Sequence, residues 1–354
     1  MDYIAKITKI IKSINEISLS EKKSTGFLIG NTAKVNLEGL YFTPIRITKS
    51  MVLGGVIVYS ENQAINIIKE IDGKVNYIFV DAEKKVGSEM SVTKENANIE
   101  RSVREVISKS KLLVYKGNDL SVESIDLLLG YLFKDTLRGL GNKKIAIIGA
   151  GNLGSKLSLK LVERGASVFL TRRNVEKLEA ITKAINLIKP AYTHAKVEGS
   201  TDNLFACHKA DILIGATNGI EVISKKIIEN LNDNAIIIDA GKGTISKNAF
   251  SIAEKRKMTI YRLDISASLS GLVESQLKIE NIINKKMGRS SLLNEDIISG
   301  GLFARENEIV VDDINNPKIV YGLSNGKGEF FQNLLPEQSK RIEKLKKHLS
   351  NLND

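Results

Sequence analysis

The sequence holds a single cysteine, Cys207, among its 354 residues. One thiol can form neither an intrachain disulfide nor a thiolate metal site, so both are excluded. Few cysteines are typical of a reducing compartment, and we therefore expect a cytoplasmic protein. The sequence also lacks an apolar run near ~18 residues and a basic N-terminal region followed by an apolar block. We therefore expect neither a membrane span nor a signal peptide.

Aromatic residues are also scarce, at 5% of the chain, although the net charge is +11. Such a charge suits nucleic acid or an anionic membrane, but the lysines are spread through every segment and no nucleic-acid-binding motif is present. We expect no nucleic-acid or membrane partner, and a surface that favours small anionic ligands. With 42% hydrophobic residues, the chain is long enough for two domains with a sizeable core.

The most informative stretch runs from residue 143 to 155 and reads KKIAIIGAGNLGS. Its apolar run, residues 145–148, predicts a buried parallel strand, and leucines at helical spacing follow. Gly149, Gly151 and Gly154 give the pattern G-x-G-x-x-G. The first glycine permits a tight turn, the second lets a pyrophosphate approach the backbone, and the third lets helix and strand pack closely. In this strand–helix context the pattern predicts a dinucleotide-binding site.

The segment after the second predicted Rossmann strand indicates which dinucleotide binds. An NAD site has an acidic residue about twenty positions beyond the glycines, for the ribose 2′-hydroxyl. Here the residues are Thr171, Arg172 and Arg173, without a carboxylate. Guanidinium groups bind phosphate oxygens, so we predict NADP, with NAD as the alternative; the two arginines could also be exposed loop residues without a ligand.

The predicted cofactor residues come from the glycine loop and from the ends of the second, fourth and fifth Rossmann strands. Small residues at the last two places let a flat ring approach the backbone, or they only form tight turns. The predicted set is Gly149, Gly151, Asn152, Leu153, Gly154, Thr171, Arg172, Arg173, Ala216, Thr217, Asn218, Gly219 and Gly241.

Strand-like and helix-like segments alternate along the chain, which predicts an α/β fold. We expect an N-terminal α/β domain for substrate and catalysis (1–121), a connecting helix and loop (122–142), a Rossmann NADP-binding domain with a doubly wound parallel sheet (143–286), and a C-terminal extension with a terminal helix (287–354). The connecting helix is expected from Val122 to Leu137, and a cleft is expected between the two lobes.

The C-terminal extension offers a strand–turn–strand pattern from residue 309 to 328. It suits a substrate lid or an oligomer-forming hairpin, and we expect a homo-oligomer. A further helix is expected at about 274–286. Asp312 and Asp313 are adjacent carboxylates, which point to opposite faces of a strand, so we expect no metal site. Gly288 and Arg289 could bind an anionic group.

Reduction of a carbonyl requires a proton donor near the developing alkoxide. The three histidines, at positions 194, 208 and 348, are expected on the surface, which leaves a lysine, a carboxylate, a tyrosine or water. The ends of the N-terminal strands supply Lys85, Lys116 and Asp119, our catalytic candidates. Lys116 and Asp119 could relay a proton as a pair. Equally, Asn118 and Asp119 could be turn residues that cap the next helix.

A small α/β lobe, a connecting helix and a Rossmann lobe resemble the amino-acid-dehydrogenase-like superfamily. Its members include shikimate dehydrogenase, the methylene-tetrahydrofolate and methylene-tetrahydromethanopterin dehydrogenases, and glutamyl-tRNA reductase. Residues 117–119 and 171–173 are similar to the Gly-x-Asn-Thr-Asp and Asn-Arg-Thr segments of shikimate dehydrogenases. This resemblance implies that Asp119 holds substrate hydroxyls and shares in a proton relay.

Other family motifs are missing. The Ser-x-Ser motif and the lysine-bearing motif of shikimate dehydrogenases are absent, so shikimate is not the expected substrate. Glutamyl-tRNA reductases use a cysteine in the N-terminal domain, whereas Cys207 is in the Rossmann half. We expect an NADP-dependent oxidoreductase that acts on a small polar or anionic metabolite. The alternatives are a methylene-tetrahydropterin dehydrogenase, which residues 78–81 and 210–220 resemble, and a non-catalytic dinucleotide sensor.

Overall fold

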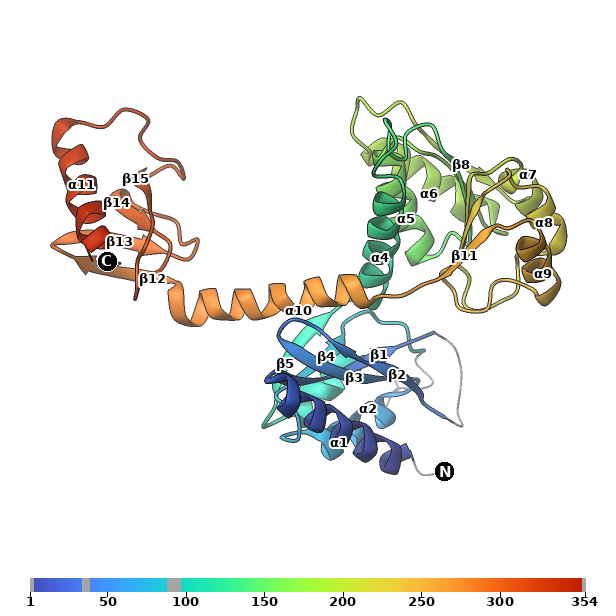
Figure 1. Ribbon diagram of the computed structural model, residues 1–354, viewed down its shortest axis with the longest axis horizontal. Helices are drawn as coiled ribbons and strands as arrows, with labels where there is room; N and C mark the ends of the chain where they lie inside the picture. Colours follow the sequence, from blue (N-terminus) through green and yellow to red (C-terminus); the bar gives the residue numbers. More distant parts are fainter. Residues whose placement is uncertain (1–2, 34–38, 88–96, 352–354) are drawn as a thin grey trace. The chain divides into compact units, whose positions relative to one another are not determined.

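The computed structural model describes residues 3–33, 39–87 and 97–351, which contain three β-sheets (Figure 1). Residues 1–271 form one compact unit and residues 272–354 a second. Within the described residues, no helix is both long and apolar enough to cross a membrane. The predicted α/β class is confirmed.

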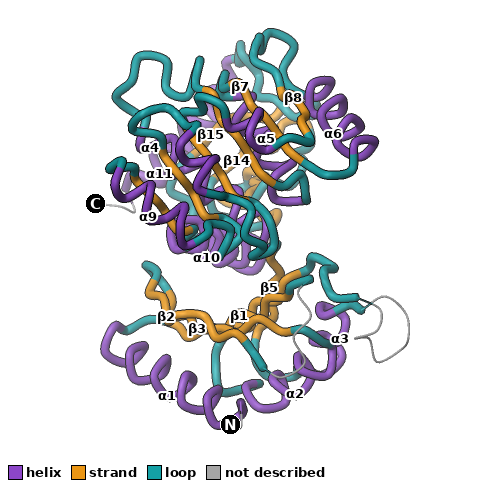
Figure 2. Tube along the Cα trace, turned by 90° about the vertical axis from the view of Figure 1, so that its right-hand side faces the viewer, coloured by secondary structure: helices purple, strands orange, loops and turns teal. Residues whose placement is uncertain are grey.

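The N-terminal domain has a five-stranded sheet in the order β2-β3-β1-β4-β5, in which only β2 is antiparallel to its neighbour. The connections from β3 through α2 to β4 and from β4 through α3 to β5 run in the same direction across the sheet. Because such crossovers are right-handed, α2 and α3 lie on the same face. Figure 2 shows α1 and α2 along that face. The elements are α1 Tyr3–Glu21, β1 Ser24–Asn31, β2 Tyr41–Ile47, β3 Met51–Val58, α2 Glu61–Ile71, β4 Tyr77–Asp81, α3 Ile99–Val106 and β5 Lys111–Tyr115.

The second sheet is the predicted Rossmann sheet, with six parallel strands in the order β11-β10-β9-β6-β7-β8. The chain reverses its direction of travel between β6 and β9, which creates the topological switch point where doubly wound sheets bind ligands. The elements are α4 Gly117–Leu132, β6 Lys144–Ile148, α5 Asn152–Glu163, β7 Ser167–Thr171, α6 Val175–Ile188, β8 Val197–Ser200, α7 Asn203–Cys207, β9 Ile212–Gly215, α8 Lys225–Glu229, β10 Ile236–Asp239, α9 Lys247–Lys255 and β11 Thr259–Arg262.

The connecting helix differs from its prediction, because α4 begins at Gly117 and ends at Leu132. Its first amide groups are bound by carboxylates from the turn after β4. The Gly117 N–H donates to Asp81 Oδ1 at 3.2 Å, and the Asn118 N–H donates to Glu83 Oε2 at 2.7 Å. Helix N-termini need such acceptors. These two lie 36 and 35 residues away in sequence, where local patterns cannot reveal them.

The C-terminal unit has its own core, in which α11 covers one face of the sheet β12-β13-β14-β15 (Figure 1). The predicted strand–turn–strand is present as antiparallel β14 and β15, and the β12–β13 hairpin was not predicted. The expected helix at 274–286 begins earlier, since Asp264 binds the amide and hydroxyl of Ser266. The elements are α10 Ser266–Asn281, a π-helical turn Ile282–Lys286, β12 Gly288–Leu292, β13 Glu295–Ser299, β14 Glu306–Val311, β15 Val320–Asn325 and α11 Pro336–Asn351.

Candidate functional site

The glycine loop has the geometry of a phosphate-binding turn. A Cβ on Gly149, whose φ is +118°, would lie 2.9 Å from the carbonyl oxygen of Ala216. A Cβ on Gly154 would lie 2.0 Å from the carbonyl oxygen of Gly149, so no larger residue fits. Around Gly151, at the start of α5, there is open space. The first and third glycines are thus needed for packing, and the second leaves room for a ligand.

The end of β7 holds this loop in place. The amides of Gly149 and Ala150 donate to the carbonyl oxygen of Thr171 at 3.2 and 2.9 Å. The half-buried Arg172 donates from Nη1 to the carbonyl oxygen of Ala150. Arg173 is exposed, and within the described chain its side chain has no hydrogen bond or ion pair. The two arginines, which the sequence treats alike, therefore have different surroundings.

The loops after β9 and β10 meet the glycine loop at the switch point. The Ala216 amide donates to Ile148 O at 2.8 Å, and the Gly241 amide donates to Gly215 O at 2.9 Å. A Cβ on Gly241 would lie 1.7 Å from Thr217 O, so the two loops are in direct backbone contact. All the predicted cofactor segments therefore lie together at the carboxyl ends of β6, β7, β9 and β10. Asn152 and Leu153 are in the first turn of α5, and Asn218 and Gly219 are in the loop after β9.

A second polar cluster lies at the carboxyl edge of the N-terminal sheet. Asp81, only 2% exposed, ends β4 and accepts from Lys85 Nζ at 2.8 Å. Glu83 Oε2 lies 2.9 Å from the same nitrogen. Burial alone would raise the pKa of Glu83, but the Asn118 amide and the charges of Lys85 and Lys156 lower it. Lys85 is thus held between two carboxylates.

The other two catalytic candidates are more exposed. Lys116 Nζ lies 4.0 Å from Asp119 Oδ2, and their side chains are 61% and 48% exposed. Asp119 binds Lys156 Nζ of α5 instead, at 2.5 Å, and Lys156 also lies 3.6 Å from Glu83 Oε1. Asn118 and Asp119 belong to the first turn of α4. Lys116 occupies the N-cap position, but its side chain makes no capping hydrogen bond.

Sequence reasoning missed three members of this network: Asp81, Glu83 and Lys156. The carboxylates stand in the stretch DAEKK directly after a predicted strand, a signal that was present. Lys156 stands two residues beyond the glycine motif and belongs to no motif. Asn31, also missed, is 6% exposed and donates from Nδ2 to the carbonyl oxygens of Asp81 and Glu83, which steadies the turn.

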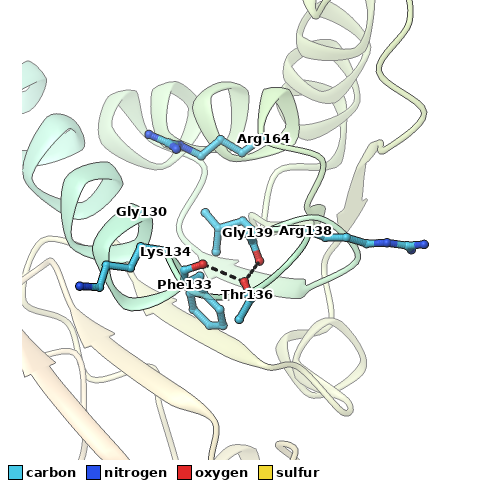
Figure 3. A pocket seen from close by; sticks show the side chains of 8 residues that line it. Gly130, Phe133, Lys134, Thr136, Arg138, Gly139 and Arg164 are labelled. Atoms are coloured by element: carbon cyan, nitrogen blue, oxygen red, sulfur yellow. Dashed lines mark hydrogen bonds between the residues drawn. The ribbon is translucent and has the colours of Figure 1, made fainter.

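A hollow of about 350 Å³ lies at the opposite edge of the Rossmann sheet, among residues that precede β6 (Figure 3). Thr136 Oγ1 donates there to the carbonyl oxygens of Phe133 and Gly139. The lining Arg164 is already paired with Asp126 at 2.6 Å. The hollow adjoins the C-terminal ends of α4 and α5, where the helix dipole disfavours anions, so it does not suit a dinucleotide.

Several other sequence candidates have structural partners. The Arg289 guanidinium binds Glu308 and the carbonyl oxygen of Phe303, so it is not available for an anion. Asp313 pairs with Lys286 at 3.0 Å, and Asp312 binds backbone amides. In the parts of the chain that the structure describes, no three His, Cys, Asp or Glu residues form a group that could hold a metal.

Comparison with known proteins agrees with this geometry. The family described as NADP oxidoreductase, coenzyme F420-dependent, matches residues 144–243. The glutamyl-tRNA reductase of Caldivirga maquilingensis is 28% identical over 176 residues, which are 49% of this chain and 39% of the reductase. That of Methanococcus maripaludis is 28% identical over 156 residues, 42% of this chain and 38% of the reductase. The chain therefore matches about two fifths of each reductase.

Among solved structures, L-tryptophan dehydrogenase from Nostoc punctiforme has a TM-score of 0.40 at 15% identity, over 71% of this chain and 72% of the dehydrogenase. These sequence relatives are glutamyl-tRNA reductases. The lack of a cysteine in the N-terminal half had argued against that activity. A specific likeness to shikimate dehydrogenase is not supported. Residues 144–243 form a Rossmann domain of the type found in NAD(P)-dependent oxidoreductases.

Proposed function

We propose that the chain is an NADP-dependent oxidoreductase that moves a hydride to or from a small polar or anionic metabolite. The geometry of the glycine loop carries this proposal. Gly149 and Gly154 pack tightly, while Gly151 leaves open space at the start of α5. A pyrophosphate there would meet free amides and the positive end of a helix dipole. The nicotinamide would lie beside residues 216–219 and Gly241, at the switch point.

The proposal of NADP instead of NAD rests on Arg173. Its exposed guanidinium follows β7, where the adenosine ribose lies in Rossmann domains, and no carboxylate at this position would repel a 2′-phosphate. Asn174, the next residue, caps α6 through its side chain and is already engaged.

The cluster at the end of β4 and β5 is proposed as the substrate site. Lys85 and Asp119 would bind the polar or anionic groups of the substrate, and Lys116 would lie at the rim. Lys156 supports this arrangement, because it joins the cofactor helix α5 to Glu83 and Asp119. The cofactor helix and the proposed substrate site are thus coupled by ion pairs.

The activity named for the sequence relatives is a separate candidate, and Cys207 argues against it. Burial is the main reason that the pKa of this thiol is raised to about 12, only partly offset by the charge of Lys144. A thiol of that kind is not a nucleophile at neutral pH. We therefore propose that the chain does not reduce glutamyl-tRNA through a cysteine thioester.

The test is a fluorescence titration with NADPH at low salt. The protein has no tryptophan, so NADPH emission can be followed without energy transfer from that side chain. We expect saturable binding that NADP⁺ displaces, and a complete lack of binding would disprove the proposal. Binding without turnover on any small carbonyl or alcohol would favour a sensor. NADP⁺ reduction with a methylene-tetrahydropterin would instead identify the dehydrogenase alternative.

A further inference from the structure

Tyr115 is a mostly buried tyrosine at the carboxyl edge of the N-terminal sheet. It is the last residue of β5 and pairs in register with Asp81 at the end of β4. Its side chain is 8% exposed, and the hydroxyl lies over β1, where a Cβ on Gly30 would come within 3.1 Å of it. Within the described ranges this hydroxyl has no hydrogen-bond partner. It is not among the enclosed polar atoms that lack a partner, so it is open to a water molecule or to the oxygen of a ligand.

The neighbouring carboxylates are bonded to other groups and make no hydrogen bond with this hydroxyl. Asp81 Oδ1 accepts from the amides of Glu83 and Gly117, and Oδ2 accepts from Lys85. Their negative charges nevertheless act on the phenol. Burial first, and then the charges of Asp81 and Glu83, raise the pKa of Tyr115 well above 10. The hydroxyl therefore keeps its proton at neutral pH and is a donor without an acceptor.

Two other polar groups of this cluster, Lys85 and Asp119, are engaged with neighbouring side chains. Lys85 already donates to two carboxylates, at 2.8 and 2.9 Å. Asp119 accepts a hydrogen bond from Lys156 Nζ. Tyr115 is thus a mostly buried group of the cluster whose proton is not shared with another side chain, whereas Lys116 is mostly exposed.

On the basis of the proposed function, we propose that the Tyr115 hydroxyl is the proton donor to the oxygen of a substrate carbonyl, an aldehyde or a ketone. The hydride of NADPH adds to the carbonyl carbon, and the π electron pair moves to the oxygen. That oxygen takes the proton of Tyr115, which gives an alcohol, NADP⁺ and a tyrosinate. The tyrosinate then recovers a proton from water. Gly30 leaves the space above β1 that the hydroxyl requires.

A first experiment needs no substrate. Tyr115→Phe removes a hydroxyl that makes no hydrogen bond, so we expect an unchanged or higher melting temperature and an unchanged Kd for NADPH. The control is Tyr131→Phe, a hydroxyl of α4 whose side chain is 67% exposed. A drop of several degrees for Tyr115→Phe alone would mean that the hydroxyl has a structural bond, and it would overturn the proposal.

The second experiment follows NADPH oxidation at 340 nm with glyoxylate, pyruvate, glyceraldehyde and 3-dehydroshikimate as probes. On a probe that the wild type reduces, Tyr115→Phe should lower kcat by about 100-fold or more, as expected for loss of a general acid, and Tyr131→Phe should not. A kcat within threefold of wild type refutes the role of Tyr115. NADPH binding without reduction of any probe refutes it too, but leaves the cofactor site intact, whereas a lack of NADPH binding refutes the proposed function itself.

Discussion

The two adjacent arginines after β7, Arg172 and Arg173, have different surroundings. Arg172 donates to the carbonyl oxygen of Ala150 and so acts on the shape of the glycine loop. Arg173 is exposed beside the proposed ribose site. Loop geometry matters to both dinucleotides, because both have the same pyrophosphate. Only NADP has the 2′-phosphate, so a contact with this group affects NADP and not NAD.

The two arginines can therefore be separated by affinity. Arg173→Gln should weaken NADPH binding about tenfold or more, the loss of one charge-assisted hydrogen bond, and leave NADH binding unchanged. Arg172→Gln should weaken both dinucleotides by similar factors. Calorimetric titration of each variant with both cofactors measures this. Equal weakening of NADPH and NADH by Arg173→Gln would rule out its contact with the 2′-phosphate.

The glycines of the loop also differ at the scale of single residues. At Gly151 (φ −91°) alanine adopts the backbone without strain and its Cβ meets no atom. We expect Gly151→Ala to keep the wild-type melting temperature and to bind NADPH about tenfold more weakly, since the methyl group occupies the space of the pyrophosphate. At Gly154 the Cβ would overlap a carbonyl oxygen, so Gly154→Ala should destabilise the fold by ~1–3 kcal/mol.

Thermal unfolding and NADPH titration of the two glycine variants form one matched experiment. Equal loss of stability in both would contradict the view that Gly151 is kept for the ligand. Unchanged NADPH affinity in Gly151→Ala would mean that the phosphates lie elsewhere.

At the scale of elements, charged side chains join segments that are distant in sequence. Asp72, the C-cap residue of α2, accepts hydrogen bonds from the backbone amides of Ser108, Lys109 and Ser110. It thereby fixes the turn between α3 and β5. Burial alone would raise the pKa of Asp72, but these hydrogen bonds outweigh it and lower the pKa from 3.8 to about 2.

This lowered pKa predicts a pH-dependent stability. The unfolded carboxyl titrates near 3.8, so the stabilisation is complete above that pH and is lost as the pH falls toward about 2. Asp72→Asn should lower the free energy of unfolding by about 1 kcal/mol at pH 7, after allowance for solvent screening, and the difference should shrink between pH 4 and pH 2. Urea denaturation across pH 2.5–7 measures it, with the exposed Asp135→Asn as the control. A difference that does not change with pH would contradict this account.

At the scale of the whole molecule, charge is unevenly distributed along the chain. The C-terminal unit, residues 272–354, has as many acidic as basic residues, so the net charge of +11 belongs to residues 1–271. These residues include both the Rossmann sheet and the N-terminal sheet. A positive field favours anionic ligands and is screened by salt.

We therefore expect NADPH binding to weaken more steeply with salt than NADH binding, because NADPH carries an additional phosphate. Between 20 and 200 mM NaCl, the Kd for NADPH should rise about threefold more than that for NADH. Parallel titrations of both cofactors provide the measurement, and identical salt slopes would contradict the expectation. The homo-oligomer expected from sequence stays a prediction, which light scattering would test.

Local patterns in the sequence determined the alternation of strands and helices, the glycine loop and the Rossmann assignment, because each depends on neighbouring residues. The tertiary structure decided where α4 begins, since the acceptors for its first amides, Asp81 and Glu83, come from the end of β4 and the turn after it. It also separated Arg172 from Arg173 and placed Lys156 between two carboxylates. These contacts depend on which strand ends are neighbours in the sheet. Pairing of side chains between strand ends produces no periodic pattern in the sequence, so it cannot be predicted from the sequence. For that reason the sequence predicted the proposed cofactor site more fully than the proposed substrate site.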